Sequence, residues 1–551
     1  MRKFIIPILL LLGICDVTAQ ENTDHDFDVI KNLDVFNIIY KHLDMMYVDT
    51  LDANEVIGNG INAMFQSLDP YTSYYPEDKL TDLKYFVSGS YAGIGSIIRY
   101  NSQINRVIID EPYEGMPAAE AGLKRGDIIL AIDDEDMTKV SQDIVSQRLR
   151  GEAGTTFVIK VLRPSTGKTM KMKITRKTIQ TPSVPYYSLR KDNIGYINLN
   201  SFTEGCSKDF RRAFIELRNQ GMKGLVFDLR NNGGGSEMEA VNIVNMFVPK
   251  GKLIVSNRGK MKRANHDYKT TVEPIDTVMP IVVLVNGSSA SSSEITSGAL
   301  QDLDRAVIMG TRTYGKGLVQ MTLDLPYNGM LKLTTNKYYI PSGRCIQAIN
   351  YKHEKGGYIE HVPDSLTRVF HTANGREVRD GGGIKPDVEI TPDSLTNLVY
   401  NLVMMRDSNE LLLNYVLDYV STHSSIAAPE EFEISDADFE EFKQRVLKSN
   451  FNYDHATEKY MDELEKLAKF EGYYDETKED FDNLRKKLKH NVKKDLDFNR
   501  EVLKEYISNE IVTSYYYQKG AIANSLRKDK DMLEAVKLLN SPEEYQKILQ
   551  P

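Results

Sequence analysis

The spacing of apolar residues divides the chain into regions with different predicted secondary structure. From Phe27 to about Gln66, apolar side chains recur at intervals of three and four, which indicates amphipathic helix. The stretch from Leu68 to Pro76 is rich in aromatic residues and bounded by prolines, so it ends this helical region. A short helical part therefore precedes the first β-rich part.

A small β module is predicted for residues 85–178. Its apolar runs are short and separated by Gly, Pro and Asp turns, which is typical of antiparallel strands. The predicted strands are residues 94–98, 107–110, 128–132, 156–162 and 170–174, with one short helix at 141–149.

Strand and helix patterns alternate over residues 179–395. Predicted strands at 194–199, 225–229 and 281–285 are each followed by a predicted helix, at 206–219, 237–247 and 293–300. This alternation predicts an α/β domain with a largely parallel sheet.

Residues 396–551 are charged and predicted to be helical. An apolar stripe at helical spacing lies among many Lys, Asp and Glu residues: Phe481, Leu484, Leu488, Val492 and Leu496. We interpret this part as a packing or oligomerisation domain without chemistry of its own.

The first residues have the pattern of an export signal. Arg2 and Lys3 precede an apolar run over 4–14, and Val17-Thr18-Ala19 supplies small residues for cleavage. The run is shorter than a membrane span requires. We predict a signal peptide at 1–19 and a periplasmic or otherwise exported protein without a stable span. An uncleaved anchor and a lipoprotein at Cys15 are the alternatives.

Length, net charge and residue composition limit the number of domains and the possible binding partners. A length of 551 residues allows about three or four domains. The net charge of −9 gives no reason to expect nucleic acid as a partner. The 9 histidines and 3 cysteines have no metal-ligand spacing, so we expect no metal and no cofactor. After export, Cys206 and Cys345 form one disulfide or stay two free thiols.

A serine-rich turn follows the predicted strand at 281–285. Such strand–turn–helix junctions expose nucleophiles in α/β folds, and the helix start supplies N–H groups for an oxyanion. Five serines qualify by type: Ser288, Ser289, Ser291, Ser292 and Ser293. A helix cap in a solvated loop explains the same residues equally well.

Lys316 lies between two glycines, which add no side-chain bulk around it. A lysine whose pKa is depressed by burial can take the proton of a serine. An ordinary surface lysine is the alternative.

The two segments together resemble the carboxy-terminal processing peptidases, also called tail-specific proteases. The matching residues are 286–295, 298–302 and 314–317. The resemblance implies that Ser291 is the nucleophile, that Lys316 is the general base and that Gln320 orients the lysine.

A glycine-rich turn after the strand at 225–229 resembles another motif of this family, D-L-R-x-N-x-G-G. Residues 228–235 lack the Lys-Ser/Thr that a phosphate-binding P-loop requires. In the family, one glycine N–H joins the N–H after the nucleophile in the oxyanion hole. The resemblance assigns these donors to Ser292 and to Gly235 or Gly234.

Residues 91–98 and 115–129 are similar to PDZ domains of bacterial proteases. Such domains bind a terminal carboxylate through backbone N–H groups of a glycine-flanked loop, and the peptide adds as a strand. The resemblance implies that this loop is Ala92, Gly93, Ile94 and Gly95. A simple glycine turn is the alternative.

We therefore predict a multidomain α/β protein with a PDZ-like β module inserted before an α/β protease core. The parts are a signal peptide (1–19), an N-terminal helical region (20–84), the PDZ domain (85–178), the core (179–395) and a C-terminal helical domain (396–551). The predicted function is a serine endopeptidase that recognises C-terminal tails of envelope proteins and forms homo-oligomers through its helical regions. The alternatives are a catalytically silent PDZ scaffold and a core-only hydrolase of small ligands.

Overall fold

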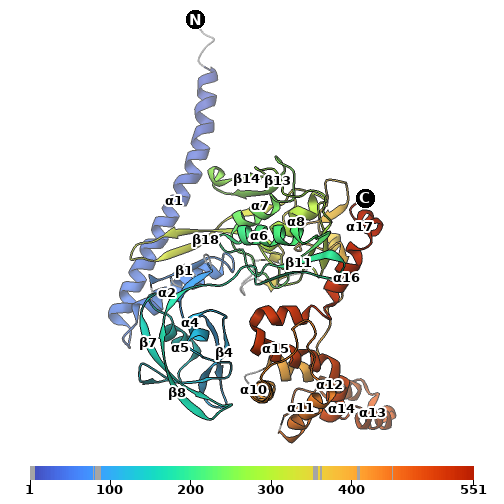
Figure 1. The fold of residues 1–551 in the computed structure, drawn as a ribbon. Helices are drawn as coiled ribbons and strands as arrows, with labels where there is room; N and C mark the ends of the chain where they lie inside the picture. Colours follow the sequence, from blue (N-terminus) through green and yellow to red (C-terminus); the bar gives the residue numbers. More distant parts are fainter. Residues whose placement is uncertain are drawn as a thin grey trace.

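The computed structural model describes residues 6–77, 80, 89–350, 358–359, 363–405, 410–449 and 451–551. Helix α1 (Ile6–Met46) projects from the body of the molecule (Figure 1). Helix α2 (Ala53–Gln66) begins at Asp52, whose carboxylate accepts the N–H groups of Asn54 and Glu55. The predicted N-terminal helical region is thus two helices. Among the described residues, no helix combines the length and apolar character needed to span a bilayer.

The predicted β module is an antiparallel sheet in the strand order β3-β4-β5-β7-β8, with β6 beside β5. Its elements are β3 (Ser96–Asn101), β4 (Arg106–Pro112), β5 (Ile128–Ile132), β6 (Glu135–Asp136), β7 (Thr156–Arg163), β8 (Lys168–Thr175), α4 (Pro117–Glu120) and α5 (Gln142–Leu149). Alternate strand residues such as Val107, Ile109 and Ile159 are fully buried. Strands β2 (Ser90–Gly93) and β9 (Lys177–Gln180) pair where the chain enters and leaves the module.

The core is a six-stranded sheet in the order β10-β11-β12-β15-β16-β23. The strands are β10 (Tyr186–Leu189), β11 (Ile194–Asn198), β12 (Gly224–Asp228), β15 (Ile281–Val285), β16 (Val307–Gly310) and β23 (Val388–Glu389). Only the β10–β11 pairing is antiparallel among these described strands. Helices α6 (Cys206–Asn219), α7 (Glu237–Val244) and α8 (Ser292–Asp302) pack on one face. The α/β prediction is confirmed.

A second sheet lies beside the core and contributes to the site described below. Its order is β1-β18-β13-β14, with β17 paired to β18. The strands are β1 (Ser73–Tyr75), β13 (Leu253–Gly259), β14 (His266–Lys269), β17 (Leu318–Asp324) and β18 (Met330–Tyr339). The shorter pairs are β19 (Ile349–Asn350) with β20 (Tyr358–Ile359), and β21 (Val369–His371) with β22 (Glu377–Arg379). Cys206 and Cys345 are both free thiols.

The C-terminal helices form two groups. Helices α10 (Leu411–Thr422), α11 (Asp436–Lys448), α14 (Val492–Phe498) and the first part of α15 (Arg500–Ser525) share a core of their own. Helices α12 (Ala456–Glu471) and α13 (Tyr474–Leu488) form a hairpin beside them. The predicted apolar stripe does not lie on one helix, because α13 ends at Leu488 and α14 begins at Val492.

The last two helices lie against the core sheet. Side chains of α16 (Lys530–Leu539) and α17 (Pro542–Ile548) pack on the second face of the core sheet, against residues such as Val226, Val282 and Val307. Figure 1 shows both helices beside the core. A parallel sheet with apolar residues on both faces must be covered on both faces, and the end of the chain supplies the missing layer.

The β module contacts the C-terminal helices through ion pairs. Arg99 donates two hydrogen bonds to Glu410, at 2.7 Å and 3.1 Å, and Arg125 pairs with Glu510 on α15. Glu111 of β4 accepts the N–H of Gln518 at 2.9 Å. The C-terminal helices therefore touch both the β module and the core.

Two leucines of α16 test whether the chain end stabilises the core. Leu538 is 5% exposed within the sheet-facing cluster, whereas Leu533 is 55% exposed. We expect Leu538→Ala to lower the free energy of unfolding by about 2–5 kcal/mol, because it leaves a cavity. Leu533→Ala is the matched control and should change that free energy by less than about 0.5 kcal/mol. Equal effects in urea unfolding would show that α16 does not pack on the sheet.

Candidate active site

Ser291 occupies a strained junction between β15 and α8. Its φ of 56° and ψ of −114° lie in a region that residues other than glycine rarely adopt. The same strand–turn–helix geometry lifts nucleophiles out of sheets in other hydrolases. The backbone conformation therefore favours Ser291 over its neighbours.

The other four serines have different surroundings. The hydroxyls of Ser289, Ser292 and Ser293 donate to the carbonyls of Leu229, Gly235 and Asn232, at 2.8 Å, 2.9 Å and 2.8 Å. Ser288 is exposed. These hydrogen bonds hold the turn in place and leave Ser291 as the candidate nucleophile.

Five of the residues predicted for catalysis line one pocket of about 310 Å³. They are Ser291, Ser292, Lys316, Gln320 and Gly235. Glu237, Lys332 and Tyr338 also line it. Residues from β17, β18 and the ends of two core strands thus meet at one place.

Lys316 lies in surroundings that favour its neutral form. Burial and the nearby Lys332 lower the pKa of Lys316 from 10.5 to about 8. Its Nζ lies over the Tyr71 ring, 4.8 Å from the ring centroid. Among the described residues, no hydrogen bond joins Lys316 Nζ to Ser291 Oγ.

Gln320 lines the pocket, and its side-chain amide donates to groups other than the lysine. Its Nε2 donates to the carbonyl of Leu318 and to Thr334 Oγ1, both at 3.2 Å. Thr334 Oγ1 in turn donates to Asp69 at 3.0 Å. In this conformation Gln320 therefore joins β17 to β18 and does not orient Lys316.

Glu294 is the important residue that the sequence analysis missed. This fully buried carboxylate accepts the N–H groups of Ser291, Gly315 and Lys316, at 2.9 Å, 2.7 Å and 2.9 Å. It also accepts the Thr313 hydroxyl at 2.5 Å. Its position three residues after Ser291 is the spacing of a capping box, a signal that could have drawn attention to it.

Glu294 joins the serine loop to the lysine loop. Burial raises its pKa from 4.5 to about 7, although the four hydrogen bonds oppose that rise. Tyr338 adds a second link, because its hydroxyl donates to the carbonyls of Ser291 and Lys316. The distance between the two loops is thus set by buried hydrogen bonds.

The predicted oxyanion donors differ in whether their backbone N–H groups are already bonded to a protein acceptor. The Gly234 N–H already donates to Asn232 Oδ1 at 2.9 Å. The N–H groups of Ser292 and Gly235 have no protein acceptor among the described residues, and both residues line the pocket. Gly235 has a φ of 144°, and a Cβ there would lie 2.5 Å from the carbonyl oxygen of Phe202. The geometry favours Ser292 and Gly235 as donors.

The predicted carboxylate-binding loop lies apart from this pocket, because none of its four residues lines it. Ala92 and Gly93 end strand β2, opposite Thr178 and Lys177. Gly95 has a φ of 68°, and a Cβ there would lie 2.5 Å from Met116 Cβ. The loop and the pocket therefore lie at different places in the structure.

Comparison with known proteins agrees with this architecture. The chain matches Peptidase family S41 over residues 193–354 and a PDZ domain over 108–163. It also matches the probable PDZ-protease, C-terminal helical domain, over 399–539. A carboxy-terminal-processing protease of Bartonella bacilliformis is 34% identical over 350 residues, which are 63% of this chain and 80% of that protein. This chain belongs to the carboxy-terminal-processing protease family.

Further relatives carry similar names. A probable CtpA-like serine protease of Staphylococcus aureus is 32% identical over 64% of this chain and 70% of its own length. Among solved structures, the photosystem II D1 C-terminal processing protease is 28% identical, with a TM-score of 0.36, over 66% of this chain and 88% of that one. The family membership makes this protein a serine peptidase with a PDZ domain.

The raised pKa of Glu294 predicts a pH-dependent stability. Because the folded state binds this proton more tightly than the unfolded state, the contribution of Glu294 to stability falls as pH rises from about 4.5 to about 7. We expect the unfolding free energy of the wild type, relative to Glu294→Gln, to fall by on the order of 3 kcal/mol across this window. Glu543→Gln, at an exposed position, should give no such trend.

Urea unfolding at several pH values measures this difference. A difference that stays constant or rises with pH would contradict the raised pKa of Glu294.

Proposed function

We propose that this serine peptidase is an endopeptidase in which Ser291 is the nucleophile and Lys316 the general base. The observation that carries the proposal is Glu294, which accepts the backbone N–H of both residues and so fixes their loops at one pocket. The proposed substrates are proteins or peptides with free C-termini.

The proposed reaction begins with a proton transfer. Neutral Lys316 takes the proton of Ser291 Oγ, which attacks the carbonyl carbon of the peptide bond. The N–H groups of Ser292 and Gly235 stabilise the oxyanion of the tetrahedral intermediate. The C–N bond then breaks as Lys316 protonates the leaving amine, and water hydrolyses the acyl ester with Lys316 again as base.

One side-chain movement is required before this reaction. Lys316 Nζ must turn from the Tyr71 ring toward Ser291, and catalytic hydrogen bonds often form only once substrate is bound. Gln320 must likewise leave Thr334 before it can orient the lysine. We propose that substrate binding brings both changes about.

Capture of the tail is assigned to the PDZ domain. Such domains bind peptides, and the Ile94 and Gly95 N–H groups have no protein acceptor among the described residues. We propose that the loop of Ala92, Gly93, Ile94 and Gly95 binds the terminal carboxylate. The substrate then extends from this loop toward Ser291.

Export and self-association are part of the proposal. The signal pattern at residues 1–19 supports export to the periplasm or cell envelope, so envelope proteins are the proposed substrates. Exposed apolar residues on α1, including Phe27, Leu33 and Phe36, support a homo-oligomer formed through helical regions.

Alanine substitutions test the dyad. We expect Ser291→Ala and Lys316→Ala each to lower kcat/KM for an unstructured protein such as β-casein by at least about 10³-fold, since neither nucleophile nor base can be replaced. Ser288→Ala, an exposed serine of the same turn, is the matched control and should keep full activity.

Circular dichroism and thermal unfolding should show that all three variants fold. Full activity in either dyad variant would refute the assignment, and an inactive wild type would favour the silent PDZ scaffold.

Tail recognition is tested with two peptides that differ only at the C-terminus. An amidated tail lacks the carboxylate, so we expect KM to rise by about tenfold or more, because a charge-assisted set of hydrogen bonds is lost. Fluorescence-quenched versions of the two peptides give the KM and kcat for each. Identical KM values would show that the carboxylate is not recognised.

A further inference from the structure

We propose that Asp529 and Asp531, at the start of α16, are positioning residues for peptide-bond cleavage. They hold Arg230, which begins the turn that carries the oxyanion donor Gly235. This inference rests on the proposed function, and it gives the end of the chain a role in catalysis.

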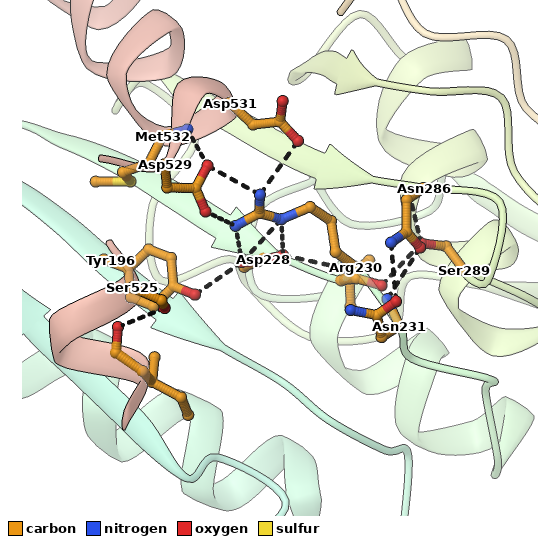
Figure 2. A network of polar contacts seen from close by, with 12 residues as sticks. Tyr196, Asp228, Arg230, Asn231, Asn286, Ser289, Ser525, Asp529, Asp531 and Met532 are labelled. Carbon is orange, nitrogen blue, oxygen red and sulfur yellow. Dashed lines mark hydrogen bonds and ion pairs between the residues drawn. The ribbon is translucent and has the colours of Figure 1, made fainter. Parts of the chain in front are cut away.

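Arg230 lies between carboxylates from two distant parts of the chain (Figure 2). Its Nη1 and Nη2 donate to both oxygens of Asp529, at 3.0 Å and 2.7 Å, and Nη1 also donates to Asp531 at 3.1 Å. On the other side, its Nε and Nη2 donate to Asp228, at 3.0 Å and 2.6 Å. The two-oxygen contact with Asp529 fixes the plane of the guanidinium.

The network is largely removed from water. The side chains of Arg230 and Asp529 are each 17% exposed, and that of Asp228 is 5% exposed. Tyr196 donates to Asp228 at 2.7 Å, so this carboxylate is itself held in place. Ion pairs in such surroundings are screened less than surface pairs and are geometrically specific.

The turn that Arg230 begins separates two cavities. Gly233 and Gly235 face the catalytic pocket, whereas Asp228, Arg230 and Asn231 line a polar cavity of about 590 Å³ beside α15 and α16. Leu229, just before Arg230, is fully buried in the core, whereas Arg230 and Asn231 face the polar cavity. Polar contacts therefore hold these two residues of the turn.

Those contacts lead from Arg230 to the serine loop. The Asn231 N–H donates to Asn286 Oδ1 at 3.0 Å, and Asn286 Nδ2 donates back to Asn231 Oδ1 at 2.9 Å. The next carbonyl, of Asn232, accepts the Ala290 N–H at 3.0 Å. Figure 2 shows the Asn231–Asn286 pair beside the Arg230 network. Loss of the carboxylates on α16 would leave the Arg230 guanidinium held, among the described residues, by Asp228 alone.

The expected consequence is a loss in kcat. If Arg230 shifts toward the cavity, the Gly235 N–H moves away from the oxyanion, and a displacement of 1 Å can cost on the order of 10²-fold in rate. The oxyanion forms in the transition state and the tetrahedral intermediate but not in the bound substrate, so KM should change little.

The variants are Asp529→Asn, Asp531→Asn and the double substitution. Asp529 also accepts the Met532 N–H at 3.0 Å as the cap of α16, and Asn caps helices equally well. The substitution thus removes charge while it keeps shape and cap. Glu534→Gln is the control, because Glu534 is exposed and, within the described part of the chain, pairs with exposed Lys537 on the same helix.

The measurement is kcat and KM for a fluorescence-quenched peptide with a free C-terminus, together with thermal unfolding. We expect the double variant to lose about 10- to 100-fold in kcat, with KM within about twofold and an unfolding midpoint near that of the wild type. Glu534→Gln should match the wild type. If the double variant fails to fold, the inference is tested by kcat, KM and the unfolding midpoint of the two single variants, judged by the same criteria.

Unchanged kcat, or a loss of activity that follows the folded fraction alone, would overturn the inference. Ser291→Ala in the same assay separates this failure from that of the proposed function. An inactive Ser291→Ala beside fully active aspartate variants refutes only the positioning role, whereas an active Ser291→Ala refutes the dyad.

Discussion

The candidate active-site pocket depends on one buried carboxylate. Glu294 has no exposed surface, and a buried charge is tolerated only when hydrogen bonds replace its water. Four donors do so, and they come from the serine loop and from the lysine loop. Because neither loop can move without breaking bonds to the same carboxylate, Ser291 and Lys316 stay at one pocket although they follow different strands.

This arrangement is supported from both faces of the core sheet. Helix α8 begins at Ser291 and packs on one face, while α16 and α17 cover the other. Residues up to Leu549 contribute to the apolar cluster on the second face. The C-terminal helices also contact the β module through Glu410 and Glu510, so the C-terminal helical region touches both the PDZ domain and the core sheet.

The sequence predicted the local elements well. The strand at 281–285 and the helix at 206–219 have the predicted bounds, because buried strands and amphipathic helices have strong apolar patterns. Resemblance to a family singled out Ser291 among five serines, which residue type alone could not do. The strained backbone of Ser291 is the physical counterpart of that choice.

Long-range contacts could not be predicted in the same way. The pattern of α16 shows that one face is apolar, but it does not say which sheet that face covers. The pairing of Arg230 with Asp529 spans 299 positions and has no local signal. The hydrogen bond of Gln320 to Thr334 likewise depends on the register between β17 and β18, and it replaces the contact with Lys316 that the resemblance implies.

The pH dependence of kcat/KM tests the central claim most directly. If Lys316 is the general base, its neutral form is required, and kcat/KM should rise with pH through a midpoint near 8. Since Lys332 lowers the pKa of Lys316, Lys332→Gln should move that midpoint to higher pH. A midpoint that Lys332→Gln leaves unchanged, or activity that falls as pH rises from 7 to 9, would contradict the assignment of Lys316 as the base.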